Sequence, residues 1–427
     1  MRFCSLSDWL SWQETQHPKA IDLGLERCNQ VAERMELKRA SFPIVTVAGT
    51  NGKGSAVAIL ESILCAAGYQ TGAYTSPHLV RYNERIRVNG KGISDEAIVA
   101  AFQTIDQTRG SISLTYFEFA TLAAMEIFRR AQVDAAILEV GMGGRLDAVN
   151  IFNANVALVT TVDIDHVQWL GKDRESIARE KAGIFRTGRP AVYGDLRPPI
   201  SLVDHAHNLC APLSCLGRDF SCAVHGDHWD WRAQGIKWQD LPRPGLTGTF
   251  QIQNAAAVLM VVKLLADNSA AFRIPLSAVR RGLGKVQLPG RFQILRGRVE
   301  RILDVAHNPQ AARALTKMLR ERPCRGRTFA VLAMLADKDI QGVITPMMEV
   351  LDAWYVASLN AHRGASGESV AQAIVQTQAS QPVRVYQTVS EAYLAAVTDA
   401  AVNDKVVVFG SFYTVGEVLR LELQKER

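Results

Sequence analysis

A glycine-rich stretch near the start of the chain, VTVAGTNGKGSAV, has the composition of a phosphate-binding loop. Gly52 and Lys53 match the end of the pattern G-x-x-x-x-G-K-[ST], whereas Val47 stands at the first glycine position. Gly54 follows the lysine, so the hydroxyl arrives one residue late, at Ser55. Backbone N–H groups of such a loop wrap a phosphate, and the lysine adds a positive charge. We predict phosphate binding rather than an ordinary strand-to-helix turn, by Asn51, Gly52, Lys53, Gly54 and Ser55.

Two further polar clusters follow apolar runs that are typical of buried strands. Glu139 ends the run AAILE, where an unpaired carboxylate is costly, so a cation must lie nearby. A metal ion meets that need, and an ion pair with Arg145 is the alternative. The sequence DIDH closes the next run, and its His166 is either a metal ligand or a core histidine. The nearby strand end at Glu139 favours the ligand.

Two more motifs could contribute to chemistry. Lys181, in REKAGIF, is expected on a helix, where a lysine is by default a surface charge. Asp304 and His307, in DVAHNP, lie at another expected strand end. The same motif predicts a helix that is capped by Asn308 and has Pro309 in its first turn.

The elements that must position these residues alternate from about residue 43 onward. FPIVTVAG, AAILEVG and VALVTTVDIDH are strand patterns, and SAVAILESILCAAG and FEFATLAAMEIFRRAQ have helical periodicity. This alternation predicts an α/β fold with a mostly parallel open sheet and right-handed crossovers. Ligands of such sheets bind at the carboxyl ends of the strands. Residues 49–55, 139–147 and 163–166 all fall there, which makes a common site the natural expectation.

The remainder of the chain predicts an insertion and a second domain. Residues 210–244 are rich in Gly, Pro, Trp and charge, and we expect a peripheral β or irregular segment, followed by the helix QIQNAAAVLMVVKLLA. The pattern changes near Pro289-Gly290. Five strand candidates follow, namely RILDVAHNP, TFAVLAML, AWYVASL, VRVY and KVVVFGSF. We expect a P-loop-type ATPase domain over residues 1–288 and a smaller, Rossmann-like α/β domain over residues 289–427.

Composition restricts the class of protein. The chain has 427 residues, too many for one compact core, and its net charge of +6 includes no dense basic block, which argues against a nucleic-acid binder. No stretch resembles a signal peptide, and the longest apolar run is interrupted by Lys263, so we expect no membrane segment and a cytoplasmic protein. Seven scattered cysteines indicate reduced thiols. A Cys/His-rich stretch at 205–228 lacks zinc-site spacing, and we expect loop and surface residues there.

The order of the motifs carries a resemblance over almost the whole chain. VAGTNGKGS, YTSPHLVRYNERI, SLTYFEF, LEVGMGGRLDAVN, DIDH, REKAGIF, LPGRFQ, DVAHNP and GSFYTV together are similar to the folylpolyglutamate synthase/dihydrofolate synthase family of the Mur ligase superfamily. SLTYFEF most resembles the bifunctional bacterial enzymes, while Met142 and Val149 are mild departures. The resemblance implies ATP-dependent ligation of L-glutamate to dihydropteroate and to reduced folates such as tetrahydrofolate, through an acyl phosphate.

The resemblance also assigns roles to particular residues. It places ATP contacts at Asn254, Arg291 and Asp304, in addition to the loop residues. It implies substrate contacts at Asp22, Leu23, Gly24, Thr115, Tyr116, Phe117, Glu118, Leu146, Asp147 and Ala148. It implies magnesium at Ser76, Glu139 and His166, and a carbamylated Lys181 that serves a second magnesium; a monovalent cation is a further candidate. The residues expected to act in catalysis are Lys53, His166, Lys181 and His307.

Gly54 removes the hydroxyl that normally follows the lysine, and we expect Ser76 to replace it as the metal ligand. Three other functions stay open at this point. One is a monofunctional folylpolyglutamate synthase, and another is a Mur-type ligase for a different amino acid, although the loop begins too early for a separate preceding domain. A nucleotide-dependent switch is the third, but it would leave TYFE and RLDA without a role. We expect small-molecule partners only and a monomer.

Overall fold

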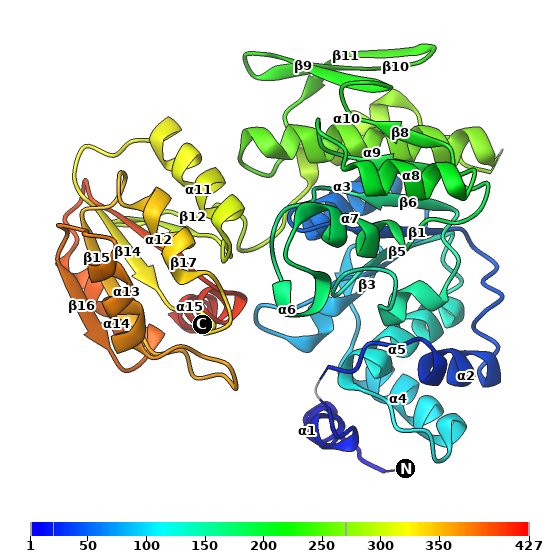
Figure 1. Cartoon of the computed structure of the whole chain (residues 1–427), viewed down its shortest axis with the longest axis horizontal. Helices are drawn as coiled ribbons and strands as arrows, with labels where there is room; N and C mark the ends of the chain where they lie inside the picture. The colour runs from blue at the N-terminus through cyan, green and yellow to red at the C-terminus, as the bar shows by residue number, and fades with distance from the viewer. Residues whose placement is uncertain (1, 20, 270, 426–427) are drawn as a thin grey trace. The chain divides into compact units, whose positions relative to one another are not determined.

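The computed structural model describes residues 2–19, 21–269 and 271–425, and it contains two compact units (Figure 1). The N-terminal unit comprises the described residues of 1–77, 83–245 and 251–287. The C-terminal unit comprises those of 288–427 together with two short segments, His78–Tyr82 and Leu246–Phe250. Leu79 explains the first of these segments, because its side chain is buried in the apolar core of the C-terminal unit.

The N-terminal unit is built on an eight-stranded sheet with the order β4-β3-β2-β5-β1-β6-β7-β8. Its strands are β1 (Ile44–Ala48), β2 (Thr71–Tyr74), β3 (Ile86–Val88), β4 (Lys91–Gly92), β5 (Ala135–Glu139), β6 (Val156–Val159), β7 (Ala191–Tyr193) and β8 (Leu213–Cys215). The six strands from β2 to β8 in this order are parallel, and β3 and β4 add an antiparallel edge. The mostly parallel sheet is therefore confirmed. Central strands are buried on both faces, which explains their continuous apolar sequences.

Helices cover both faces of this sheet. They are α1 (Leu6–Gln16), α2 (Glu26–Arg34), α3 (Lys53–Ala66), α4 (Asp95–Arg109), α5 (Tyr116–Arg130), α6 (Val167–Leu170), α7 (Arg174–Ala182), α8 (Ile200–Asn208), α9 (Thr249–Asn268) and α10 (Leu276–Lys285). Figure 1 shows α3, α9 and α10 above the central strands β1 and β5, and α4 and α5 below those two strands. Helices α3 and α10 approach closely at Gly282, where a Cβ would lie 2.5 Å from Cα of Ile63. Lys181 lies on α7, so the helix expected for it is confirmed.

Helix α9 is the one helix within the described residues that is long and apolar enough to cross a membrane. Its most apolar window has a mean hydropathy of 1.4, and 67% of that window is buried inside the protein. The core of the N-terminal unit therefore accounts for the apolar composition of α9.

The predicted insertion is a separate three-stranded antiparallel sheet, which Figure 1 shows outside α9 and α10. It consists of β9 (Phe220–His225), β10 (His228–Ala233) and β11 (Ile236–Pro242). Trp231 attaches it to the core, because its indole Nε1 donates to the carbonyl of Ala256 on α9 at 3.0 Å. Among the described residues no three His, Cys, Asp or Glu side chains are grouped to hold a metal ion.

The C-terminal unit contains a six-stranded sheet with the order β12-β13-β17-β14-β15-β16. The strands are β12 (Gln293–Leu295), β13 (Glu300–Leu303), β14 (Thr328–Leu332), β15 (Ala353–Ala357), β16 (Val383–Tyr386) and β17 (Lys405–Phe409). All five predicted strands form and pair in parallel, and β12 adds an antiparallel edge. The helices are α11 (Pro309–Glu321), α12 (Ile340–Met347), α13 (Gly367–Gln376), α14 (Val389–Asp399) and α15 (Phe412–Lys425).

Candidate active site

The glycine-rich loop connects β1 to α3, as the sequence predicts. Gly49 has φ 148°, and a Cβ there would lie 1.9 Å from Oγ1 of Thr160, so a side chain cannot be accommodated. Gly52 is the N-terminal cap of α3 in a left-handed conformation, with φ 89°. Left-handed backbone favours glycine, and it leaves the first N–H groups of α3 directed out of the helix. The loop thus has the geometry of an anion-binding helix N-terminus.

Lys53 is held over this loop. Its Nζ donates to the carbonyl oxygens of Gly49 at 3.0 Å and Thr50 at 3.4 Å. The ammonium group is also close enough to Asp147 and Lys181 to affect the pKa of both side chains. Lys53 therefore links the phosphate loop to the two other expected parts of the site.

A pair of amides from α9 packs beneath the loop. Asn254 lies against Gly52, where a Cβ would be 2.6 Å from the Asn254 Oδ1. The Asn254 side chain donates to Oε1 of Gln251 at 3.0 Å, and Gln251 in turn donates to the Ser55 hydroxyl. Gln251 was not among the predicted site residues. Its spacing of three residues from Asn254, on one face of a helix, is the signal that could have found it.

Ser76 and Glu139 meet at the ends of two neighbouring strands, β2 and β5. The backbone N–H of Ser76 donates to Oε2 of Glu139 at 3.2 Å, and the Glu139 side chain is buried. Arg145, the alternative partner considered for Glu139, forms an ion pair with Glu180 at 2.9 Å. The two residues offer a carboxylate and a hydroxyl at one strand-end corner, which is a donor set that suits Mg²⁺.

His166 and Lys181 lie near the carboxyl end of β6. His166 has φ 51° and caps α6, and its Nε2 is 3.9 Å from a carboxylate oxygen of Asp165. Lys181 is buried, contrary to the default of a surface charge. Burial and the neighbouring Lys53 lower the pKa of Lys181 to about 7, while Asp165 acts in the opposite direction. β6 ends at Val159, four residues before DIDH begins, so the expectation that DIDH itself ends the strand is corrected.

The loop after β5 brings two of the predicted substrate residues together. A Cβ at Gly141 would lie 2.7 Å from the Phe117 ring and 3.3 Å from Oδ2 of Asp147. Asp147 accepts hydrogen bonds from the N–H groups of Met142 at 2.9 Å and Val149 at 3.0 Å. Burial raises the pKa of Asp147 to about 6, although these N–H groups and Lys53 work against the rise. Leu146 is half-buried and Ala148 is buried, on either side of this carboxyl group.

Two of the predicted substrate residues, Asp22 and Glu118, are joined by Arg27, which was not among the predicted site residues. Arg27 of α2 contacts Asp22 at 2.7 Å and Glu118 at 3.2 Å. Glu118 also accepts from the Thr115 N–H at 2.7 Å, and the Thr115 hydroxyl accepts from the Glu118 N–H, which forms a capping box at the start of α5. Nε2 of His17 lies 3.0 Å from Oδ2 of Asp22, the same oxygen that Arg27 contacts. Arg27 is thus the residue that ties the predicted segments 22–24 and 115–118 to each other.

The thiol of Cys28 lies close enough to both Glu118 and Asp147 for their charges to affect it. Burial raises the pKa of the Cys28 thiol, and the carboxyl groups of both Glu118 and Asp147 contribute to that rise. The predicted substrate residues therefore surround one region beside α2 and α5. Leu23, Gly24, Tyr116 and Phe117 are half-buried there.

Two of the predicted residues of the C-terminal unit, Arg291 and His307, lie near Phe412. The Arg291 guanidinium lies 5.0 Å from the centre of the Phe412 ring, and the His307 ring lies 6.2 Å from it. Asp304 is buried and accepts from the N–H of Phe292 and of Ala306, each at 2.8 Å. Burial raises the pKa of Asp304, and Arg291 counteracts that rise.

The residue after His307 forms the predicted helix cap. Asn308 caps α11 by accepting from the Ala311 N–H at 2.9 Å, and Pro309 opens the helix. His307 itself has its Nδ1 2.8 Å from the carbonyl oxygen of Val305. The capping reading of DVAHNP is therefore confirmed, and it leaves the imidazole of His307 beside the strand end.

Comparisons with known proteins agree on one family. The Mur ligase middle domain matches residues 47–193, and the Mur ligase, glutamate ligase domain matches residues 290–412. The chain is 44% identical to the dihydrofolate synthase/folylpolyglutamate synthase of Escherichia coli, over 97% of this chain and 95% of that protein. The corresponding Haemophilus influenzae protein is 39% identical, over 96% of each chain.

Solved structures give the same result. The structure of Escherichia coli FolC in complex with DHPP and ADP has a TM-score of 0.93 to this chain at 43% identity, and covers 99% of both chains. A bifunctional folylpolyglutamate synthase/dihydrofolate synthase with Mn, AMPPNP and L-glutamate bound has a TM-score of 0.90 at 43% identity, over 98% of both chains.

Proposed function

The chain belongs to the dihydrofolate synthase/folylpolyglutamate synthase family of Mur ligases, and we propose how its residues divide the work of that reaction. It is an ATP-dependent ligase that joins L-glutamate to dihydropteroate and to reduced folates, and it uses a divalent cation. The observation that carries this function is the position of Lys53, which belongs to the phosphate loop and also interacts with Asp147 among the substrate residues. A nucleotide phosphate and a substrate carboxylate would therefore meet within reach of one lysine.

The reaction needs two substitutions and no protein nucleophile. A carboxylate oxygen of the pteroate or folate attacks the γ-phosphorus of ATP, and the bond to the β-phosphate oxygen breaks to release ADP. The amine of glutamate then attacks the acyl carbon, loses a proton, and displaces phosphate to leave an amide. Phosphoryl transfer of this kind depends on positioning and charge neutralisation. The loop N–H groups and Lys53 are suited to hold the phosphates in place.

For the metal, we assign Ser76, Glu139 and His166 as ligands. A hydroxyl, a carboxylate and an imidazole, completed by phosphate and water oxygens, form an acceptable set for Mg²⁺, which neutralises phosphate charge when bound. Ser55 is a poor candidate, because its hydroxyl is buried and contacts Gln251.

Lys181 is assigned as a carbamate that serves a second magnesium. Carbamylation requires a neutral amine, and the burial of Lys181 beside Lys53 favours that form. A monovalent cation is a further candidate cofactor. Removal of bicarbonate and carbon dioxide from the buffer tests the carbamate, since activity should then decline and return when bicarbonate is restored.

For the substrates, we assign the pterin to the region bordered by Asp22, Glu118 and Asp147. Carboxylates accept hydrogen bonds from the N–H groups of a pterin, and Phe117 provides an aromatic face beside them. Glutamate and the adenosine part of ATP are assigned to the domain of residues 289–427, with Arg291 and Asp304 on ATP. His307 is assigned to the glutamate and the acyl phosphate.

Phosphate release tests these assignments and separates the bifunctional enzyme from a monofunctional one. With ATP, Mg²⁺ and glutamate, release should depend on either dihydropteroate or tetrahydrofolate. Activity with tetrahydrofolate alone would indicate a folylpolyglutamate synthase only. We also propose a cytoplasmic location, which the seven free cysteines support. We further propose a monomer, which light scattering at assay concentration tests.

A further inference from the structure

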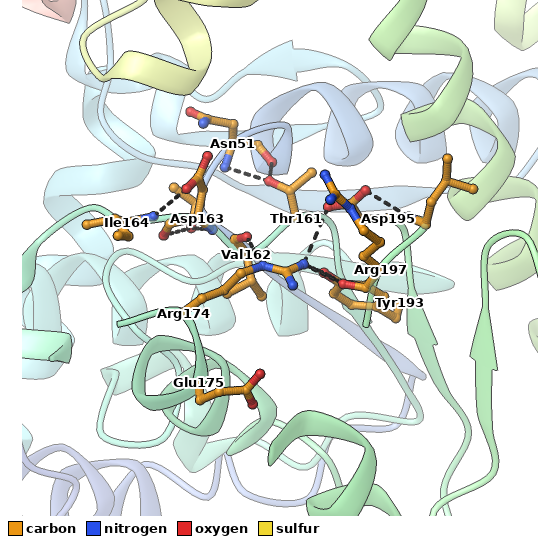
Figure 2. Close-up of polar contacts among 12 residues, drawn as sticks. Asn51, Thr161, Val162, Asp163, Ile164, Arg174, Glu175, Tyr193, Asp195 and Arg197 are labelled. Carbon is orange, nitrogen blue, oxygen red and sulfur yellow. Dashed lines mark hydrogen bonds and ion pairs between the residues drawn. The ribbon is translucent and has the colours of Figure 1, made fainter. Parts of the chain in front are cut away.

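Arg174 connects two segments of backbone beside the phosphate loop (Figure 2). It is the first residue of α7, the helix that also carries Lys181. Its Nε donates to the carbonyl of Val162 at 3.0 Å. The other end of the guanidinium donates to the hydroxyl of Tyr193 at 3.0 Å and to the carbonyl of Arg197. One side chain thus holds the chain after β6 and the chain after β7.

Arg174 lies where the pairing between strands β6 and β7 has ended. The last register pair between β6 and β7 is Val159 with Tyr193. Beyond it, residues 160–163 have no strand assignment and continue towards Asp165 and His166. Arg174 supplies hydrogen bonds across the two segments after the sheet ladder has ended, and the Asp195 carboxylate lies 3.8 Å from its guanidinium.

The phosphate loop bonds the same segment from the other direction. The Thr50 N–H donates to the carbonyl of Thr161 at 2.8 Å. The Thr50 hydroxyl lies 3.0 Å from both the N–H and the carbonyl oxygen of Asp163. The Asn51 N–H donates to the Thr161 hydroxyl at 3.2 Å, as Figure 2 shows. Residues 161–163 therefore share bonds with the phosphate loop and with Arg174.

We propose that Arg174 is a positioning residue for the metal and phosphate site, an inference that rests on the proposed function. It holds residues 161–163 so that the phosphate loop and His166 keep their spacing when the metal and the nucleotide bind. The fork of a guanidinium can reach several backbone acceptors at once, whereas a lysine ammonium is a single point of charge. A lysine at residue 174 would keep the positive charge but lose the link between the two segments.

The test compares Arg174→Ala and Arg174→Lys with a matched control, Arg218→Ala. Arg218 also joins a strand carbonyl to an aspartate, since it bonds Leu213 at 2.8 Å and Asp219 at 2.9 Å, but it lies at the β8 edge. Two quantities are measured, namely the Mg²⁺ concentration at half-maximal rate with saturating ATP, and KM for dihydropteroate. ADP binding is then titrated by calorimetry with Mg²⁺ and with EDTA.

Arg174→Ala should raise the half-saturating Mg²⁺ concentration about tenfold, which matches the loss of one or two hydrogen bonds. Arg174→Lys should raise it by a smaller factor of about threefold, and KM for dihydropteroate should change less than twofold in both. Mg²⁺ should strengthen ADP binding less in these variants than in the wild type. Arg218→Ala should leave all these quantities unchanged.

A lower melting temperature with an unchanged Mg²⁺ requirement would mean that Arg174 only stabilises the fold, and the inference would be overturned. If Arg174→Ala does not fold, Arg174→Lys and Tyr193→Phe test the inference instead. Tyr193→Phe removes the hydroxyl that accepts a hydrogen bond from Arg174, and it should raise the Mg²⁺ requirement about twofold. Failure of the proposed function is distinguishable, since the wild type would then lack glutamate-dependent phosphate release, while Mg²⁺-dependent ADP binding would still test Arg174.

Discussion

The hydroxyl of Ser55 accepts a hydrogen bond from Nε2 of Gln251, with 3.3 Å between the two atoms, in the core of the N-terminal unit. This contact engages the Ser55 hydroxyl, which stands one residue beyond the position where a phosphate-binding loop usually offers a hydroxyl to its metal ion. Ser76, by contrast, lies beside the carboxylate of Glu139 at a strand end. The difference leads directly to a prediction about the metal.

Ser76→Ala should raise the Mg²⁺ concentration needed for half-maximal activity by about three- to tenfold, because it removes one metal ligand. Ser55→Ala should shift that concentration less than twofold and should mainly lower the melting temperature, since it removes a buried partner of Gln251. Magnesium titrations of the two purified variants check this. A larger shift for Ser55→Ala would show that the loop supplies the ligand.

Lys53→Ala should lower kcat by about 10²–10⁴-fold and leave the fold intact. The lysine provides a charge-assisted contact to a transferring phosphoryl group, which is worth several kcal/mol in the transition state. Steady-state phosphate release gives kcat, and circular dichroism reports the fold. Unchanged turnover in a folded variant would rule out the role of the loop.

Lys181→Arg should be nearly inactive, because arginine keeps the charge but cannot form a carbamate. Lys181→Ala should also be inactive, yet small carboxylates such as acetate should restore part of its activity by taking the place of the carbamate oxygens. Phosphate release with increasing acetate measures the rescue. An active arginine variant without rescue of the alanine variant would mean that Lys181 acts as a simple cation.

Asp147→Asn should become more stable relative to the wild type as pH rises from about 4 to about 6. The pKa of Asp147 in the folded protein is about 6, above the ordinary value of 3.8. The protonated carboxyl group therefore contributes fully to the free energy of unfolding below pH 4, and this contribution is lost as pH rises through 6. The asparagine cannot titrate. The shift corresponds to at most about 3 kcal/mol at neutral pH. Urea unfolding of both proteins at pH 4, 5, 6 and 7 checks this, and a pH-independent difference would contradict it.

Arg27→Lys should raise KM for dihydropteroate about tenfold and change KM for ATP less than twofold. The guanidinium holds Asp22 and Glu118 together, and a lysine can contact only one of them well. Arg34→Lys is a suitable control on the same helix, because Arg34 bonds the backbone of Arg109 away from these carboxyl groups. Equal increases in both KM values of Arg27→Lys would indicate a general loss of structure instead.

Much of the site follows from local sequence. The glycines and lysine of residues 49–55, between an apolar strand and a helix, predict a phosphate loop, because glycine permits the left-handed turn that leads into a helix start with free N–H groups. The capping pattern of DVAHNP determines the start of α11 in the same way. The parallel sheets follow from continuous apolar runs separated by helices.

The contacts between distant segments were decided by the tertiary structure. The sequence placed Glu139 and His166 on consecutive strands, but β1 lies between β5 and β6 in the sheet, so those two strands are not neighbours. Arg27 reaches Glu118 across 91 residues, and Gln251 reaches Ser55 across 196. Periodicity and capping are set by residues a few positions apart, whereas strand order and side-chain partners depend on how the whole chain packs. The residue types of the site could therefore be predicted from the sequence. The contacts of Arg27 and Gln251 with site residues became visible only in the tertiary structure.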